Sequence, residues 1–215
     1  MKRAPIKVNL AARAANAEIR RRRTRARLID AALAVVADKG LAATIEDFAA
    51  AAGVARGTVY NYFPTVADLL DAVRRRILRD VGEGLGVALA QVSDPAAELA
   101  TLSLFLVAYS QRQPLQGWAA LHLERLQPGR RTDGADPFDR ILARGVAEGR
   151  FRAVDVGAAR ILAAGAVRMA IHDALTRPAP GEQVVSVCGL ILASLGVPPA
   201  EALAIAESAA RRLAA

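Results

Sequence analysis

Cysteine, histidine and aromatic residues are scarce in this sequence of 215 residues. The single cysteine, Cys188, excludes an internal disulfide and fits a reducing cytoplasm. It lies in an apolar helical run, where we expect a small buried hydrophobic residue rather than a redox sensor. The only histidines, His122 and His172, have no cysteine or histidine at ligand spacing, so we expect no metal site.

Long hydrophobic runs are also missing. The longest, residues 184–200, contains two prolines and stays below the roughly 18 uninterrupted apolar residues of a membrane helix. The N-terminus lacks the apolar stretch of a secretory signal, so we expect a cytoplasmic protein with no membrane partner. The sequence has no phosphate-binding loop, no glycine-flanked nucleophilic serine and no cysteine–histidine pair. We therefore expect neither an enzyme nor a bound cofactor.

What the sequence has instead is an uneven charge. Residues 1–27 hold ten lysines and arginines against one acid, Glu18, which gives +9; the whole chain carries +8, so residues 28–215 sum to −1. Such basic N-terminal segments commonly bind nucleic acid, and a solubilising tail is the alternative. We predict a flexible basic arm over residues 1–22, whose charge is centred on Arg20, Arg21, Arg22 and Arg23.

Residues 49–63, AAAAGVARGTVYNYF, indicate a helix, a glycine turn and a second helix. Ala49 lets the two helices approach closely, Gly53 suits the positive φ of the turn, and Val59 anchors the second helix to the core. The outward face of the second helix is polar and aromatic, which suits the major groove of DNA. It carries Arg56, Gly57, Thr58, Tyr60, Asn61 and Tyr62.

The rest of the chain also predicts helices, so the expected fold class is all-α. A first helix over about residues 20–39 ends at Gly40, and Thr44 and Thr65 each begin a helix with an aspartate three residues later. We place a DNA-binding domain at residues 23–84 and a larger helical domain at 85–215. Gly82, Gly84 and Gly86 indicate either a frayed helix end between them or a hinge. Further helices are expected at 95–112, 115–126, 136–149, 155–176, 183–195 and 199–212.

Residues 24–77 resemble the TetR family of transcriptional regulators. The resemblance rests on TRARLIDAALAVVADKG, on ATIEDFAAAAGVARGTVYNYFPTVADLLDAV and above all on the run G-T-V-Y-N-Y-F-P before a capped helix. The later segment AEGRFR, residues 147–152, matches in addition. The resemblance implies a homodimer that binds a near-palindromic operator on double-stranded DNA, with a C-terminal domain that binds a small molecule and thereby releases the DNA.

The resemblance also implies a role for each residue of the motif. Arg56, Gly57 and Thr58 open the recognition helix and meet base edges, where an arginine can grip guanine with two hydrogen bonds. Asn61 reaches a base or the backbone. Tyr60 and Tyr62 clamp phosphates or touch thymine methyl groups, unless they pack between helices. The helix N-termini at Thr44 and Thr65 offer backbone N–H groups to phosphate.

Three features depart from the family pattern. Ala55 stands where a serine often caps the recognition helix, and Val66 stands where a lysine often contacts phosphate. Glu46 and Asp47 put negative charge in the first turn of a helix that faces a polyanion. We therefore expect the basic arm to supply much of the electrostatic affinity for DNA.

In the larger domain, small and aliphatic residues recur at helical spacing on two helices and favour close packing. We predict that they form a four-helix dimer interface, with an ordinary intramolecular core as the alternative. The predicted interface residues are Ala159, Ala163, Ala166, Ala170, Val184, Cys188, Ile191 and Leu195.

The effector pocket is predicted from the aromatic residues between residues 84 and 151. We take Phe105, Tyr109, Trp118 and His122 as its lining, with plain core packing as the alternative. The sequence as a whole predicts a homodimeric repressor released from its operator by a small-molecule effector. The alternative is a ligand-independent or architectural DNA-binding protein of the same fold.

Overall fold

The computed structural model describes residues 10–126, 136–177 and 181–214, and within these ranges the chain is helical and contains no strand. This confirms the all-α class. In the described ranges no helix is both long and apolar enough to cross a bilayer. The helices are α1 (Leu10–Lys39), η1 (Gly40–Ala42, a 3-10 helix), α2 (Ile45–Ala52), α3 (Arg56–Tyr62), α4 (Val66–Leu89), α5 (Pro95–Arg112), α6 (Pro114–Leu126), α7 (Pro137–Ala147), α8 (Val156–Thr176), α9 (Gly181–Ser194) and α10 (Pro199–Ala214).

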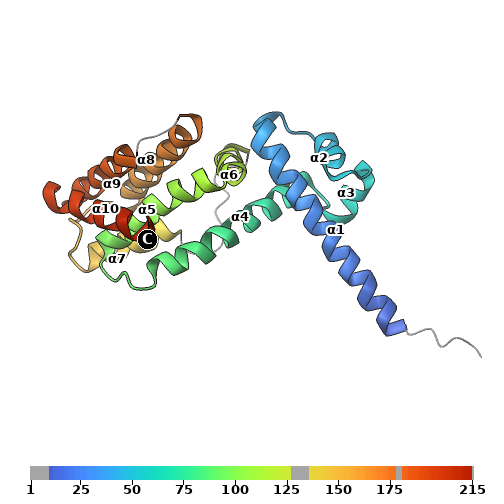
Figure 1. Ribbon diagram of the computed structural model, residues 1–215, viewed down its shortest axis with the longest axis horizontal. Coiled ribbons are helices and arrows are strands. Elements are labelled where there is room, and N and C mark those ends of the chain that lie inside the picture. Colours follow the sequence, from blue (N-terminus) through green and yellow to red (C-terminus); the bar gives the residue numbers. More distant parts are fainter. Residues whose placement is uncertain (1–9, 127–135, 178–180, 215) are drawn as a thin grey trace, which may run out of the picture.

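Two hydrophobic clusters hold the described part of the chain together. The first joins α1 to α4 around Leu28, Phe48 and Val59, and it also takes in residues of α6. The second, larger cluster joins α5 with the four helices α7, α8, α9 and α10. Val81 of α4 packs against both clusters. Figure 1 shows the same arrangement, with α1 to α3 at one end of an elongated molecule and α4 running into the other.

The helix ends of the motif have the local geometry that their residues predict. The Thr44 hydroxyl accepts a hydrogen bond from the Asp47 backbone N–H, and the Asp47 carboxylate accepts one from the Thr44 backbone N–H. Thr65 and Asp68 form the same capping box at α4. Gly53, between α2 and α3, has φ +64°, a conformation that side-chain-bearing residues rarely adopt.

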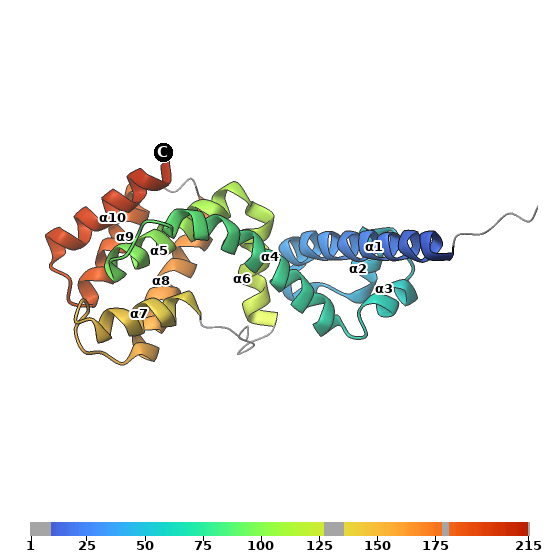
Figure 2. The ribbon, with the colours of Figure 1, turned by 90° about the horizontal axis from the view of Figure 1, so that it is seen from below.

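The first helix begins about ten residues earlier than predicted. Residues 10–22 continue α1, so the expected start near residue 20 is wrong, while the flexibility of the arm stays a prediction and residues 1–9 lie outside the described ranges. The reason is composition: alanine and arginine are strong helix formers, and Glu18 accepts a hydrogen bond from Arg22 Nε one turn later at 2.8 Å. In Figure 2 this end of α1 projects beyond α2 and α3, away from the second cluster.

The glycines of α4 do not form a frayed end, because the helix continues through Gly82, Gly84 and Gly86 to Leu89, while the hinge alternative stays a prediction. A Cβ atom on Gly84 would lie 2.8 Å from Cζ of Phe105, so this glycine lets α4 lie close against α5. Tertiary packing thus outweighs the helix-propensity cost of about 1 kcal/mol per glycine. The domain division at residue 84 falls inside this continuous helix and stays a prediction.

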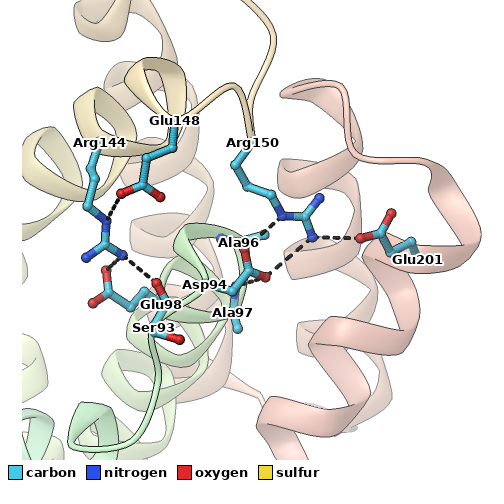
Figure 3. Close-up of polar contacts among 9 residues, drawn as sticks. All are labelled: Ser93, Asp94, Ala96, Ala97, Glu98, Arg144, Glu148, Arg150 and Glu201. Carbon is cyan, nitrogen blue, oxygen red and sulfur yellow. Dashed lines mark hydrogen bonds and ion pairs between the residues drawn. The ribbon is translucent and has the colours of Figure 1, made fainter.

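Arginines from the end of α7 and the turn after it fasten the second cluster together. Arg150 donates hydrogen bonds to the carboxylates of Asp94 at 2.8 Å and Glu201 at 2.7 Å, and thereby joins the start of α5 to the start of α10 (Figure 3). Burial opposes ionisation of Asp94, but the bond from Arg150 keeps the pKa of this carboxyl below its ordinary value. Arg144 reaches Glu98 at 2.8 Å beside it. The AEGRFR segment therefore has a structural role in the described fold.

Candidate nucleic-acid interface and sensor half

The short helix α3 stands on Val59, which is 1% exposed, and turns its polar side outward. Arg56, Gly57 and Asn61 are exposed, and Tyr60 is 37% exposed. The other two predicted contact residues on α3, Thr58 and Tyr62, are half-buried, and Tyr62 packs against the first cluster. The two tyrosines thus differ, since Tyr60 is the more exposed of the two.

Arg56, the first residue of α3, is held by two neighbours. Its Nη1 atom lies 2.8 Å from Oε1 of Glu46 on α2, and its guanidinium carbon lies 5.6 Å from the centre of the Tyr60 ring. The side chains of Arg56 and Glu46 are 60% and 62% exposed, so water surrounds the pair. The guanidinium retains further N–H donors that can bind a base or a phosphate.

The N-termini of α2 and α4 use their threonine hydroxyls internally. Thr44 and Thr65 are exposed, but each hydroxyl is bound within its capping box, so these ends offer backbone N–H groups only. At α2 a hydrogen bond from Lys39 and two from Thr44 lower the pKa of Asp47 to about 2. Asp47 is therefore anionic near neutral pH, with its charge opposed by Lys39 at 2.6 Å.

The four consecutive arginines of the predicted arm, Arg20 to Arg23, lie exposed on α1. An open groove of about 200 Å³ lies between α1 and α4, beginning at Arg22 on α1. Arg25, on its wall, places its guanidinium carbon 4.9 Å from the ring centre of Phe63, the residue that ends α3. The groove is lined by Arg22, Arg25, Ala26, Ile29, Arg76 and Arg79.

The sequence interpretation did not single out the α4 side of this groove. Its signal is the pair of arginines three residues apart on each helix, Arg22 with Arg25 and Arg76 with Arg79, because that spacing places both members on one helix face. Part of the positive charge is balanced within the groove, since Arg76 lies 2.9 Å from Asp80 and 3.4 Å from Asp30.

The predicted effector residues lie in two places. Phe105 and Tyr109 belong to the second cluster and stack with ring centres 5.9 Å apart. Trp118 packs against the first cluster, and the His122 ring stacks on the Trp118 ring with ring centres 6.0 Å apart. A Cβ atom on Gly40 would lie only 2.8 Å from Nδ1 of His122. The His122 ring therefore covers the turn that ends α1.

A chain of polar contacts connects these two places. The Tyr109 hydroxyl donates a hydrogen bond to Oε1 of Gln116 on α6, and Gln116 Nε2 donates to Asp80 on α4 at 3.3 Å. Asp80 in turn accepts from Arg76, which reaches Asp30 on α1. Burial raises the pKa of the Tyr109 phenol, so the hydroxyl stays a donor at neutral pH. Both halves of the molecule therefore share one hydrogen-bonded chain.

The residues predicted to form the dimer interface point into the chain's own core. Ala159, Ala163, Cys188, Ile191 and Leu195 are buried, and Ala166, Ala170 and Val184 pack partly buried against the same cluster. The five buried side chains pack as the intramolecular alternative expects, whereas an interface role for Ala166, Ala170 and Val184 stays a prediction. Helical spacing marks a packed face but does not say whether its partner belongs to the same chain.

Cys188 is the one thiol of the sequence and is 2% exposed. Burial raises its pKa to about 12, so the thiol remains protonated and unreactive at physiological pH. This agrees with the expectation of a small buried hydrophobic residue.

The opposite faces of α8 and α9 carry exposed apolar side chains. Ile161, Leu162 and Met169 of α8 are 66%, 52% and 65% exposed, and Leu190 of α9 is 70% exposed. Leu162 and Met169 are seven residues apart, two helical turns, so they share one face. Large apolar side chains gathered in this way mark interaction surfaces on soluble proteins.

Comparison with known sequences finds regulators of transcription. Residues 28–73 match the bacterial regulatory proteins of the tetR family. The HTH-type transcriptional repressor LfrR of Mycolicibacterium smegmatis is 41% identical over 91 residues, which are 42% of this chain and 45% of LfrR. The chain thus spans about half the length of the curated relatives it matches.

Comparison with solved structures extends over nearly the whole fold. The crystal structure of RolR without ligand is 30% identical with a TM-score of 0.59, and the match covers 84% of this chain and 95% of RolR. The structure of RolR in complex with resorcinol is 28% identical with a TM-score of 0.58, covering 88% and 95%. The similarity therefore includes both the helix-turn-helix end and the second cluster.

Proposed function

This chain belongs to the tetR family of bacterial regulatory proteins, and on that premise we propose that it is a homodimeric repressor released from its operator by a small organic effector. The observation that carries the DNA-binding part is the outward side of α3. Arg56 and Asn61 are exposed there while Val59 fixes the helix to the core. A short helix held in this way can place its first residues against base edges in the major groove.

The electrostatic part of the binding is proposed to come from α1. The arginines at positions 20–23 are exposed on a helix that projects past α2 and α3 (Figure 2). Phosphate contacts by such residues supply affinity without sequence preference, whereas Arg56 supplies the preference.

The effector is proposed to be a small aromatic or amphipathic molecule that binds beside Phe105 and Tyr109. Both residues lie on α5 in the second cluster, and Tyr109 begins the polar chain that reaches α4 and α1. RolR, which shares this fold, has been solved with the phenol resorcinol. An effector that engages the Tyr109 hydroxyl would break its bond to Gln116 and change the contacts of α4.

Dimerisation is proposed to use the exposed apolar faces of α8 and α9. A symmetric pairing of these faces would bury Leu162, Met169 and Leu190 against their copies. Two copies of α3 related by this symmetry would read a near-palindrome with half-sites one helical turn apart, or a multiple of it.

The test is selection of bound duplexes from random and genomic DNA by the wild type and by Arg56→Ala. The expected result is a short near-palindrome for the wild type and a loss of preference at one guanine of each half-site for the variant, worth about 1–3 kcal/mol. Binding that is tight but sequence-blind in both proteins would contradict the repressor function.

The effector part is tested on the selected operator by titration of small phenols, with Tyr109→Phe as the variant. Tyr109→Phe keeps the ring and removes the hydroxyl. We expect wild-type DNA affinity to fall when a suitable phenol is added, and the variant to respond less. A complex that no small molecule weakens would support the ligand-independent alternative.

A further inference from the structure

The ion pair between Glu46 and Arg56 is unusual for its position. Glu46 is the second residue of α2 and Arg56 the first of α3, so the pair bridges the two helices of the motif on its outer surface, with a separation of 2.8 Å. A carboxylate at this surface repels a polyanion, and an exposed ion pair contributes little to stability. An acid in the first turn of α2 is favoured by the helix N-terminus, but this does not account for the pairing of Glu46 with Arg56.

The other acids near the helix N-termini do have structural partners. Asp47 and Asp68 each close a capping box, and Asp47 also binds Lys39. Glu46 takes no part in a capping box, and within the described residues its recorded side-chain contact is to Arg56. The negative charge of Glu46 is therefore directed at the arginine that opens the recognition helix.

We propose that Glu46 is a specificity-determining residue of the DNA interface, a step that rests on the proposed role of Arg56. Glu46 occupies one N–H of Arg56 and the Tyr60 side chain also binds the guanidinium, while the remaining N–H groups can reach the two acceptors of a guanine edge. A phosphate at the same place would face the Glu46 carboxylate as well, and the two anions repel each other. A guanine edge carries no net charge, so its repulsion by the carboxylate is weaker than that of a phosphate.

Glu46 therefore lowers affinity for DNA in general while it preserves affinity for the correct base. Without its charge, Arg56 is free to bind any backbone phosphate within reach, and the ring of Tyr60 beneath it does not prevent this. Discrimination obtained by penalising the wrong contact is a known route to specificity.

The experiment measures the dissociation constants of Glu46→Gln for the selected operator and for random-sequence duplex of equal length. Glutamine keeps the side-chain length and an acceptor oxygen but removes the charge. We expect binding to random duplex to tighten about two- to fivefold, the scale of one exposed charge pair, and operator binding to tighten less. The ratio of the two constants, which defines specificity, falls accordingly.

The matched control is Glu18→Gln. Glu18 also pairs with an arginine, Arg22, at 2.8 Å on an exposed surface of α1, but it lies far from α3 in sequence and has no contact with Arg56. This variant should tighten both duplexes by the same factor and leave the ratio unchanged. In an Arg56→Ala background, Glu46→Gln should likewise leave the ratio unchanged.

The outcomes separate the two proposals. If the wild type discriminates, Arg56→Ala loses discrimination and Glu46→Gln behaves as Glu18→Gln does, Glu46 is only a bulk charge and this inference is wrong while the proposed function stands. If the wild type itself shows no sequence preference, both fail. Thermal unfolding of each variant, monitored by circular dichroism, verifies that the motif is intact.

Discussion

Asp47 shows how much a single residue can coordinate in this fold. Its carboxylate accepts hydrogen bonds from the Thr44 backbone at 2.9 Å and the Thr44 hydroxyl at 2.8 Å, and Lys39 lies 2.6 Å away. Lys39 closes α1 and Asp47 belongs to the first turn of α2, so one side chain connects the end of one helix to the start of the next. These partners favour the charged form of Asp47.

The first prediction concerns the titration of Asp47. Because its pKa is lowered from 3.8 to about 2, its contribution to stability is complete above pH 3.8 and is lost as the pH falls toward 2. NMR titration of the carboxyl carbon should give a midpoint near 2 in the wild type. Lys39→Met removes the strongest hydrogen bond to the carboxylate and should raise the midpoint, while an unchanged midpoint would assign the lowered pKa to Thr44 alone.

At the scale of whole elements, local residue chemistry predicts most helix boundaries. The capping threonines, Gly53 and the Asp94-Pro95 start of α5 act over a few residues, and the structure has them as expected. Two boundaries depend on more than local signals. The start of α1 reflects the summed propensity of alanines and arginines. The passage of α4 through its glycines reflects the contact of Gly84 with Phe105, which lies on the next helix.

The sequence also predicts part of the candidate site. The motif predicts which residues of α3 face outward, because the turn and the buried Val59 fix the orientation of the helix. The pairing of Arg56 with Glu46 and the groove between α1 and α4 depend on how helices cross, which periodicity does not encode. The same limit explains why periodicity did not show that Ala159, Ala163, Cys188, Ile191 and Leu195 pack within the chain's own core.

The second prediction compares two glycines of α4. A methyl group at Gly84 would collide with the buried Phe105 ring, whereas one at Gly86 meets nothing within 4 Å. Gly86→Ala should therefore stabilise the protein by up to about 1 kcal/mol through helix propensity. Gly84→Ala should destabilise it, since overpacking costs typically 1–3 kcal/mol. Urea unfolding gives the free energy of unfolding of each variant, and equal stabilisation by the two substitutions would contradict close packing at Gly84.

At the scale of the whole molecule, the exposed apolar faces of α8 and α9 are the observation on which the proposed dimer rests. The third prediction is that Met169→Glu shifts the protein toward monomer in sedimentation equilibrium, because it puts a charge into the proposed dimer interface. Val87→Glu is the control. Val87 is 80% exposed on α4, so its replacement should leave assembly unchanged.

Loss of assembly has a further expected effect on DNA binding. A monomer engages one half-site, so Met169→Glu should bind a full operator and an isolated half-site with similar affinity. If Met169→Glu and Val87→Glu sediment alike as dimers, the interface lies elsewhere on the molecule.

The projecting start of α1 carries many positive charges, so salt should have opposite effects on the stability of this helix and on its binding to DNA. The side chains of residues 15–23 are all exposed, and Arg20 and Arg23, about one turn apart, repel each other. Added salt screens that repulsion and stabilises the helix, while it weakens attraction to DNA phosphates. Phosphates neutralise the same charges, so the operator should do locally what high ionic strength does in solution: extend an ordered helix along the double strand.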